Sequence, residues 1–487
     1  MDASFVEKWQ GLRVVVVGDV MLDRFIYGQV ERISPEAPIP ILHFQSEKAM
    51  LGGAANVARN VVALGGRAVL IGALGQDDGG DLIANKLTVQ EGIDGSFVRI
   101  AGHPTTLKTR YVSGIHQIMR LDVERRLALD IATADDICAR FAAVVGDADA
   151  VVLSDYDKGV LSREVIRRIV GLARSRGVPI VVDPKVRDID RYAGATVLTP
   201  NAAEAAMITG LDCRQDDSAG IAARRLCELA AVETVVVTRG AQGMTIWDPA
   251  NRPAGPTTIA TAASEVFDVS GAGDTVVAAL ALALANGASV TDSASIANVA
   301  AGIAVGKRGT AVVRARELAK ALKGISGSDL KIVSNTEAAV TVADWKAHGL
   351  RVGFTNGCFD LIHPGHIELL WRARAACDRL VVALNTDASV RRLKGSSRPV
   401  QREWARSVVM AAINHVDLVT LFDEDTPLEL IQSLKPDCLI KGADYTIDNV
   451  VGADFVRTYG GQVLLVPLED GHSTTSIISR ANVGAAA

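Results

Sequence analysis

The sequence predicts two α/β domains: a doubly wound parallel sheet that carries a small β lid, followed by a smaller domain of the same class. Short apolar runs, mostly β-branched, alternate with amphipathic stretches through the first three hundred residues, and the rhythm resumes after a small polar stretch at 324–328. Apolar strands separated by helices are typical of parallel sheets covered on both faces. A chain of 487 residues also exceeds the usual size of a single core.

The first domain, residues 1–324, is expected to contain six strands and several helices. The expected strands are Leu12–Val17, Ala68–Ala73, Ala150–Leu153, Pro179–Val182, Thr196–Leu198 and Thr234–Val237. The expected helices are Asn56–Leu64, Arg163–Arg174, Asp217–Ala230 and Val276–Ala285. Two further segments, Arg24–Phe44 and Phe97–Val123, combine β-forming residues with turn residues and no intervening helix, so they predict the lid.

A linker and connecting helix are expected over 325–349, with the helix at Thr336–His348, and the second domain over 350–487. The second domain is expected to hold five strands: Arg351–Thr355, Arg379–Leu384, Leu418–Leu421, Cys438–Lys441 and Gln462–Val466. This size and strand number suit a single Rossmann-like nucleotide-binding domain.

Composition narrows the class of protein. Hydrophobic residues make up 49% of the chain and the net charge is −5, without a block of like charges that would suit nucleic acid. The six cysteines are scattered with no CxxC pair, which favours reduced thiols. The N-terminus lacks a signal-peptide pattern, and the longest apolar run is about half of what a bilayer requires. We expect a soluble, cytoplasmic protein that binds neither membrane nor nucleic acid.

The string DVSGAGDT, residues 268–275, is the most informative stretch of the chain. It runs directly into the predicted helix Val276–Ala285, and small residues before a helix let backbone N–H groups converge on an anion where the helix dipole adds positive charge. Asp274 would lie in the first turn, where its carboxylate can act as a general base towards a phosphate acceptor.

Other small and polar residues fall at the carboxyl ends of predicted strands, where open α/β sheets bind ligands. Asp19 and Asp23 follow the first strand, although each alone also suits a turn or a helix cap. Gly52 and Gly53 allow the close approach of a polyhydroxyl ligand, to which Asn56 offers a donor and an acceptor. The segment Asn201-Ala202-Ala203-Glu204 suits phosphate binding and equally suits a helix N-cap with Glu204 in a capping box.

Together these strings resemble the ribokinase (PfkB) family of sugar kinases over residues 11–320, and the resemblance implies a ribokinase-like fold. It implies that Asp274 takes the proton of the attacking sugar hydroxyl and that the amides of Gly271, Ala272 and Gly273 stabilise the transferring phosphoryl group. Asn201 and Glu204 would organise Mg²⁺ and phosphate, and Glu204 would reach the ion through water. ATP would be a substrate, and a monovalent cation such as K⁺ is implied near Asp268.

The string TNGCFDLIHPGH, residues 355–366, follows the first strand of the second domain. His363 and His366 stand at a helix start without a third ligand of suitable spacing, so we expect them to face phosphate and not zinc. The string resembles the HxGH nucleotidyltransferase family. That resemblance implies nucleotide or phosphate contacts from two clusters of residues: Phe359, Lys394, Lys441 and Asp444, and the hydroxyl-rich Ser473, Thr474 and Thr475. Taken alone, a cation such as Lys394 would be read as a solvated surface residue, and Ser473 would be read as a helix N-cap.

The order of the two domains, with strings such as RISPEAPIP, LSDYDKG and RLKGSSRPV, resembles a family of bifunctional heptose 7-phosphate kinases and heptose 1-phosphate adenylyltransferases. The implied partners are ATP and heptose phosphates. Cations on the lid would meet the substrate phosphate or serve a dimer interface: Arg24, Lys108, Arg110 and Arg120. Unpaired lid edges favour a homodimer. Two alternatives stay open: a different sugar kinase joined to a cytidylyltransferase, and a non-catalytic protein that keeps both folds.

Overall fold

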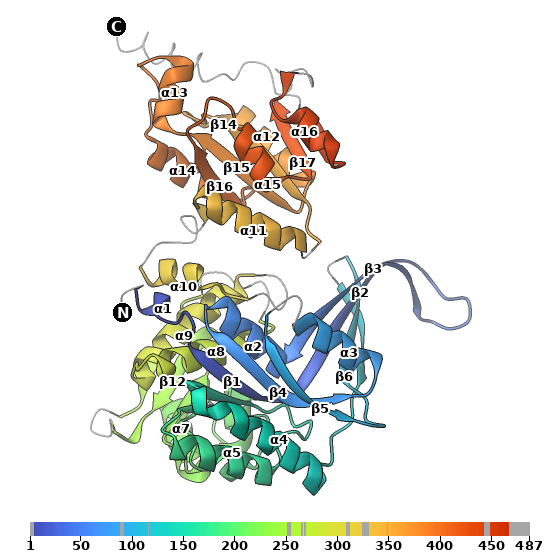
Figure 1. Ribbon diagram of the computed structural model, residues 1–487, viewed down its shortest axis with the longest axis vertical. Coiled ribbons are helices and arrows are strands. Elements are labelled where there is room, and N and C mark those ends of the chain that lie inside the picture. The colour runs from blue at the N-terminus through green and yellow to red at the C-terminus, as the bar shows by residue number, and fades with distance from the viewer. Residues whose placement is uncertain are drawn as a thin grey trace. The chain divides into compact units, whose positions relative to one another are not determined.

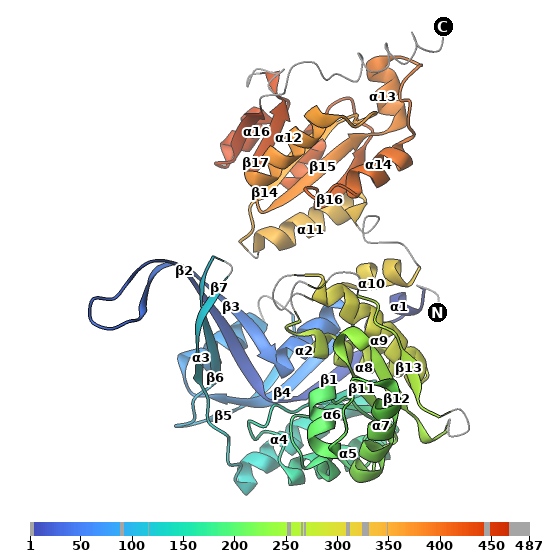
Figure 2. The ribbon, with the colours of Figure 1, turned by 180° about the vertical axis from the view of Figure 1, so that it is seen from behind.

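The computed structural model describes residues 4–87, 92–114, 116–250, 255–263, 266, 269–307, 312–323, 331–347, 349–442 and 449–466. The chain divides into two compact units, Met1–Lys323 and Gly324–Ala487. The first is built on a nine-stranded and a four-stranded sheet, and the second on a five-stranded sheet. Figures 1 and 2 show each unit from opposite sides.

The main sheet of the first unit has nine strands in the order β13-β12-β11-β10-β9-β8-β1-β4-β5. The strands are β1 (Arg13–Gly18), β4 (Arg67–Gly75), β5 (Asp94–Ile100), β8 (Ala150–Ser154), β9 (Ile180–Asp183), β10 (Val197–Leu198), β11 (Thr234–Thr238), β12 (Met244–Trp247) and β13 (Thr257–Ile259). Strands β12 and β13 are antiparallel additions at one edge, and the other neighbouring pairs are parallel.

Helices cover both faces of this sheet. They are α1 (Ser4–Glu7), α2 (Ala54–Ala63), α3 (Asp78–Asn85), α4 (Ile131–Val144), α5 (Arg163–Ser175), α6 (Ala202–Thr209), α7 (Asp216–Ala230), α8 (Ala272–Ala285), α9 (Val290–Val305) and α10 (Ala315–Leu322). Strand β1 shows the two-sided burial: Val14 and Val16 pack with α2, α8 and α9, while Val15 and Val17 pack with α4, α5 and α7. Side chains alternate along a strand, so an all-valine run serves two cores.

The lid is a separate four-stranded sheet in the order β3-β2-β6-β7: β2 (Val20–Ile33), β3 (Pro40–Gly53), β6 (Thr106–Ser113) and β7 (His116–Val123). Figure 2 shows it projecting from the helix-covered sheet, with β2 and β3 as a long hairpin. The two lid segments expected from the sequence are β-structure, but Phe97 belongs to β5 of the main sheet. Asp19 joins β1 to β2, so the chain leaves the main sheet for the lid beside the expected site.

The second unit has an entirely parallel sheet in the order β16-β15-β14-β17-β18. Its strands are β14 (Val352–Gly357), β15 (Arg379–Asn385), β16 (Leu418–Phe422), β17 (Cys438–Gly442) and β18 (Gln462–Val466), close to the five expected. Its helices are α11 (Asn335–Ala347), α12 (Pro364–Ala375), α13 (Asp387–Lys394), α14 (Glu403–Ala411), α15 (Leu428–Leu434) and α16 (Ala453–Thr458). Chain order reverses at β14, so a crevice is expected at its carboxyl end.

The connecting helix α11 packs within the second unit. Its buried face, Ala338 and Val342, joins a core that contains β14 and β16. Just before it, the Val333 amide donates to the Val419 carbonyl at 2.9 Å, and the Asn335 side chain accepts from Thr420 Oγ1 at 2.7 Å. Physically, α11 is therefore a layer of the second domain.

Candidate active sites

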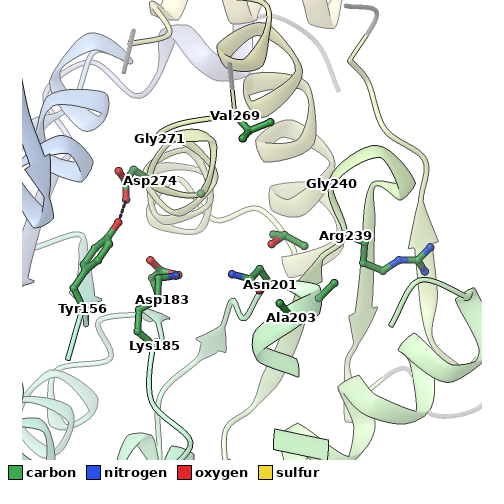
Figure 3. A pocket seen from close by; sticks show the side chains of 13 residues that line it. Tyr156, Asp183, Lys185, Asn201, Ala203, Arg239, Gly240, Val269, Gly271 and Asp274 are labelled. Atoms are coloured by element: carbon green, nitrogen blue, oxygen red, sulfur yellow. Dashed lines mark hydrogen bonds and ion pairs between the residues drawn. The ribbon is translucent and has the colours of Figure 1, made fainter. Parts of the chain in front are cut away.

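A cavity of about 470 Å³ opens at the carboxyl edge of the main sheet of the first unit. Figure 3 shows the side chains around it. Its lining comes from the loop after β8 (Tyr156), the end of β9 and the segment after it (Asp183, Lys185), the start of α6 (Asn201, Ala202, Ala203), the end of β11 (Thr238, Arg239, Gly240) and the start of α8 (Val269, Gly271, Gly273, Asp274). Two helix N-termini thus face one cavity, an arrangement that favours bound anions.

Asp274 lies in the first turn of α8, as the sequence predicts, and is almost fully buried at 6% exposure. Both of its oxygens accept a hydrogen bond: Oδ2 from Asn56 Nδ2 at 2.7 Å and Oδ1 from Tyr156 Oη at 2.8 Å. Burial raises the pKa of Asp274, while these two donors and the charge of Lys185 lower it in part. The result is an oriented carboxylate at the cavity wall, suited to general-base chemistry.

Gly271 begins this helix in a left-handed conformation, with φ of 78°. Thr275 anchors the turn, since its N–H and Oγ1 both donate to the Gly271 carbonyl and the hydroxyl also reaches Asn60 Oδ1 at 3.0 Å. The segment Gly271–Gly273 therefore approaches the cavity as backbone without bulky side chains, as expected for an anion-binding turn. Asp268 lies outside the described residues.

The start of α6 carries the capping box expected for Asn201 and Glu204, and Asn201 also lines the cavity. A capping box is present, since Glu204 N–H donates to Asn201 Oδ1 at 2.9 Å and Asn201 N–H donates to Glu204 Oε2 at 2.8 Å. The other oxygen of Glu204 pairs with Lys185 Nζ at 2.8 Å. The capping box thus leaves Ala202 and Ala203 on the cavity wall and directs Glu204 towards the Lys185 ammonium group.

Asp183 and Lys185 were not among the site residues expected from the sequence, and neither was Tyr156. Lys185 lies 3.5 Å from Asp183 Oδ1. Burial opposes its charge, but Asp183, Glu204 and Asp274 together raise the pKa of Lys185 above its usual value. Burial, only partly opposed by Lys185, raises the pKa of Asp183 to about 7. The string DYDKG follows β8, and the string DPK begins at the last residue of β9. This position at the carboxyl edge of the sheet is the signal by which the sequence could have identified the three residues as part of the site.

The lid junction brings the remaining expected residues close to this cavity. The carboxylate of Asp19 is held by the loop after β8: it accepts hydrogen bonds from the N–H groups of Tyr156, Lys158 and Val160 at 2.9, 2.9 and 3.1 Å. Burial raises the pKa of Asp19 to about 6, although the Lys158 N–H opposes this. Asp19 thereby shapes the loop that carries Tyr156.

The paired glycines are required by close packing. Gly53 has φ of 60°, and a Cβ there would lie 2.4 Å from the Asp19 carbonyl oxygen. A Cβ on Gly52 would lie 2.3 Å from Asp23 Oδ2. Asp23 itself pairs with Arg110. Among the other lid cations, Arg24 pairs with Glu47 at 2.7 Å and Arg120 with Asp122 at 2.9 Å.

Arg239 lines the same cavity with its backbone, while its side chain points away, as Figure 3 shows. The guanidinium bonds Asp216 in the first turn of α7 and Thr245 Oγ1 at 2.9 Å. The loop at Thr238–Gly240 therefore presents its backbone to the cavity.

In the second unit, the two histidines lie together at the start of α12. His363 is the N-cap residue, and its ring stacks on that of His366 with centroids 3.7 Å apart. Phe359, with φ of 45°, contacts His366 at a centroid distance of 4.9 Å. Burial, and next the electrostatic influence of His363 and Lys394, lowers the pKa of His366 to about 4. The imidazole of His366 is therefore neutral at pH 7.

The neighbouring strand and loop complete this second site. Lys441, at the end of β17, donates from Nζ to the Asn356 carbonyl of β14 at 2.9 Å, so it lies at the reversal point of the sheet. Lys394 ends α13 and is exposed. Asp444, Ser473, Thr474 and Thr475 lie outside the described residues.

Asp360, inside the HxGH string, organises this site in a way the sequence did not reveal. It is buried and accepts Arg398 Nε at 2.6 Å and the N–H groups of Val400 and Gln401 at 2.8 and 2.9 Å. The fully buried Arg406 donates to the Cys358 carbonyl at 2.7 Å and to Asp387 at 2.8 Å. These bonds tie the loop after α13 to the histidine motif, and Arg398 neutralises Asp360.

The comparisons with known proteins agree with this division. Residues 12–315 match the pfkB family of carbohydrate kinases, and residues 354–480 match a cytidylyltransferase-like family. Among solved structures, Arabidopsis thaliana ribokinase, complexed with ribose and ATP, matches with a TM-score of 0.52 at 22% identity, over 64% of this chain and 99% of its own. Escherichia coli phosphofructokinase-2, in complex with potassium, gives 0.54 at 20% identity over 65% and 99%.

These observations define an enzyme that joins a sugar kinase to a nucleotidyltransferase. Relatives match over the whole length: the bifunctional protein HldE of Caulobacter vibrioides is 51% identical over 99% of both chains, and that of Rhodospirillum rubrum is 51% identical over 99% of this chain and 97% of its own. The chain belongs to the family of the bifunctional protein HldE. The expectation of a sugar kinase followed by a nucleotidyltransferase is confirmed, and a non-catalytic protein is the disfavoured alternative.

Proposed function

We propose that the chain makes two steps of ADP-heptose synthesis for the lipopolysaccharide core. The first domain phosphorylates O1 of D-glycero-β-D-manno-heptose 7-phosphate with ATP. After a separate phosphatase removes the 7-phosphate, the second domain transfers AMP from ATP to D-glycero-β-D-manno-heptose 1-phosphate and releases pyrophosphate. Full-length similarity to a bifunctional family supports the pairing, and the buried Asp274 at the cavity carries the kinase chemistry.

In the kinase step Asp274 accepts the proton of the sugar O1 hydroxyl as O1 forms its bond to the γ-phosphorus of ATP. The bond from that phosphorus to the bridging oxygen breaks, and ADP leaves. The amides of Gly271, Ala272 and Gly273 and the Lys185 ammonium group stabilise the negative charge on the transferring group, because phosphoryl transfer depends mainly on positioning and charge neutralisation.

Mg²⁺ would be held by the ATP phosphates and, through water, by Glu204, aided by Asp183. In the described part of the chain, no group of three or more His, Cys, Asp or Glu side chains lies close enough together to hold a metal ion without the substrate. That donor set fits Mg²⁺, which commonly keeps several waters and takes one or two carboxylates with substrate phosphates. When bound, the ion neutralises phosphate charge. A K⁺ requirement is proposed by analogy with the potassium complex of phosphofructokinase-2 and is tested by replacing K⁺ with Na⁺ in the kinase assay.

In the second domain the sugar 1-phosphate attacks the α-phosphorus of ATP and pyrophosphate leaves. The attacking phosphate is already ionised, so this step needs no carboxylate base. His363 and His366 lie where a helix N-terminus meets phosphate, and Lys394 and Lys441 supply cations near them. Phe359 shapes the turn against His366. Asp444, Ser473, Thr474 and Thr475 complete our proposed nucleotide contacts.

For the sugar, we propose contacts from Asp23, Gly52, Gly53 and Asn56 at the lid junction. The ion pair of Arg110 with Asp23 brings a cation to the same place, which suits a substrate that already carries a phosphate. Asp19 supports this site through the Tyr156 loop.

We propose a homodimer in the cytoplasm. Strands β3 and β7 form the outer edges of the lid, and exposed apolar side chains such as Phe44, Met119 and Leu121 lie on them. Sedimentation of the full chain tests this. All six cysteines are free thiols, which fits a reducing compartment. Among the described residues, no helix is long and apolar enough to cross a membrane.

The deciding experiment incubates the protein with magnesium ATP and heptose 7-phosphate, beside hexose and pentose phosphate controls, with products read by phosphorus NMR. A heptose bisphosphate formed selectively supports the kinase assignment. Turnover of a pentose or hexose phosphate instead would overturn the pathway. Competition between ATP and CTP in a heptose 1-phosphate assay separates an adenylyltransferase from a cytidylyltransferase.

A further inference from the structure

Two side chains, those of Asn56 and Tyr156, donate hydrogen bonds to the carboxylate of Asp274, and they come from different elements of the fold. Asn56 stands on α2 and was expected at this site from the sequence. Tyr156 stands on the loop after β8, and its Oη donates to Asp274 Oδ1 at 2.8 Å, as the dashed line in Figure 3 marks. A tyrosine hydroxyl here donates only if it keeps its proton. Burial, and next the charge of Asp274, raises the pKa of Tyr156 well above its usual value, so the hydroxyl stays protonated.

The Tyr156 loop is braced from both sides. Asp19 accepts three of its N–H groups, including that of Tyr156 itself at 2.9 Å. Asp155 accepts the Asp157 N–H at 2.8 Å and the Tyr192 hydroxyl at 2.6 Å. The ring of Tyr156 also lies 5.6 Å from Lys185 Nζ, in cation–π range. The Tyr156 hydroxyl is therefore held in place by a loop that Asp19 and Asp155 fix through hydrogen bonds.

We propose that Tyr156 is a positioning residue of the kinase: its hydroxyl fixes the Asp274 carboxylate in the orientation and charge state that accept the sugar proton. With Asn56 on Oδ2 and Tyr156 on Oδ1, rotation of the carboxylate would break one of two charge-assisted hydrogen bonds. The proposal rests on the proposed kinase function and names a residue that acts through Asp274.

Among the described residues, titratable groups from several elements act on the charge state of Asp274. They include Tyr156 from the loop after β8, Asp183 at the end of β9, Lys185 just after it, and Asp23 from β2. Burial, Asp23 and Asp183 favour the protonated acid, whereas Lys185, Tyr156 and Asn56 favour the carboxylate. Removing one donor shifts that balance towards the acid, which cannot accept a proton.

The test is Tyr156→Phe in the full-length enzyme, which removes one oxygen and keeps the ring near Lys185. We expect kcat of the kinase at pH 7 to fall about tenfold, KM for sugar and ATP to change less than about twofold, and the acidic limb of the kcat–pH profile to move up by about one pH unit. Adenylyl transfer by the same preparation should be unchanged, and it reports that the protein is folded.

Tyr459→Phe is the control, because it removes a tyrosine hydroxyl that donates to the Pro436 carbonyl at 2.9 Å in the second unit and takes no part in the Tyr156 loop. It should leave the acidic limb in place. An unmoved limb in Tyr156→Phe would overturn the proposal. So would a raised sugar KM with unchanged kcat, since Tyr156 would then be a substrate contact.

A second measurement does not depend on the sugar. The protonated carboxyl of Asp274 is followed by infrared difference spectroscopy against Asp274→Asn, over a pH titration with and without the Tyr156 hydroxyl. We expect a higher midpoint in Tyr156→Phe. If the wild-type enzyme proved inactive on every heptose while this midpoint still moved, the proposed substrate would fail and the positioning role would stand. An equal midpoint in both proteins would overturn the role itself.

Discussion

Replacing Asp360 by Asn should selectively destabilise the second domain. The side chain of Asp360 is 1% exposed and that of its partner Arg398 is 13% exposed. Its two oxygens accept from Arg398 Nε, Val400 N–H and Gln401 N–H. An amide retains one acceptor, presents N–H groups to donors, and leaves Arg398 without its counter-charge.

The size of the effect follows from these contacts. A broken buried ion pair costs about 3–5 kcal/mol, and the acceptor that Asn keeps recovers part of this, so we expect a loss of about 3 kcal/mol. For a domain of this size, about 2–4 °C per kcal/mol gives a fall in Tm of about 6–12 °C. Burial favours the acid, but the Gln401, Val400 and Arg398 bonds outweigh it and lower the pKa of Asp360. Its stabilisation is therefore present above the unfolded value of 3.8 and is lost as pH falls below it.

The assay heats the full chain at a series of temperatures and measures the residual activity of each site. Each activity then reports the thermal stability of the domain that carries it. Adenylyl transfer should be lost at lower temperature in Asp360→Asn, and kinase activity should survive as in the wild type. The control is Asp454→Asn, which changes a fully exposed carboxylate in the same domain and should leave the stability of that domain nearly unchanged. An adenylyltransferase midpoint equal to that control would refute the reasoning.

Three further outcomes are expected. Asp274→Asn should abolish kinase turnover and keep adenylyl transfer, and His366→Ala should do the reverse; loss of both activities in one folded variant would contradict two independent sites. NMR titration of His366 should give a midpoint near 4 in the free protein and a higher midpoint with bound triphosphate. The contribution of His366 to the stability of the domain should decline as pH falls from 6.5 towards 4, because in that range only the unfolded chain binds the proton. Gly53→Ala should lower kinase stability by about 1–3 kcal/mol in chemical denaturation, since its φ is 60° and a Cβ would meet the Asp19 carbonyl oxygen; wild-type stability would argue against strain at this glycine.

Much of the fold was readable because its signals are local. Valine-rich runs such as Val14–Val17 indicate a strand buried on both faces, and the glycines at Gly271 and Gly273 mark a helix start at the wall of the cavity. The boundary of the lid was less well predicted. Phe97 has the same β propensity in either sheet, and only pairing with β4 assigns it to the main one.

By itself the sequence determined the two α/β domains, their order, the position of Asp274 before α8 and that of the histidines before α12, since strands, turns and helix starts follow from neighbours in the chain. Only the tertiary structure brought Tyr156 and Asn56 to the two oxygens of Asp274, 118 and 218 residues away in sequence. It likewise turned Asp19 into a brace for a loop and paired Asp360 with Arg398. The physical reason is that a hydrogen bond or an ion pair depends on distance in space, which the packing of distant strands sets and local residue preference does not.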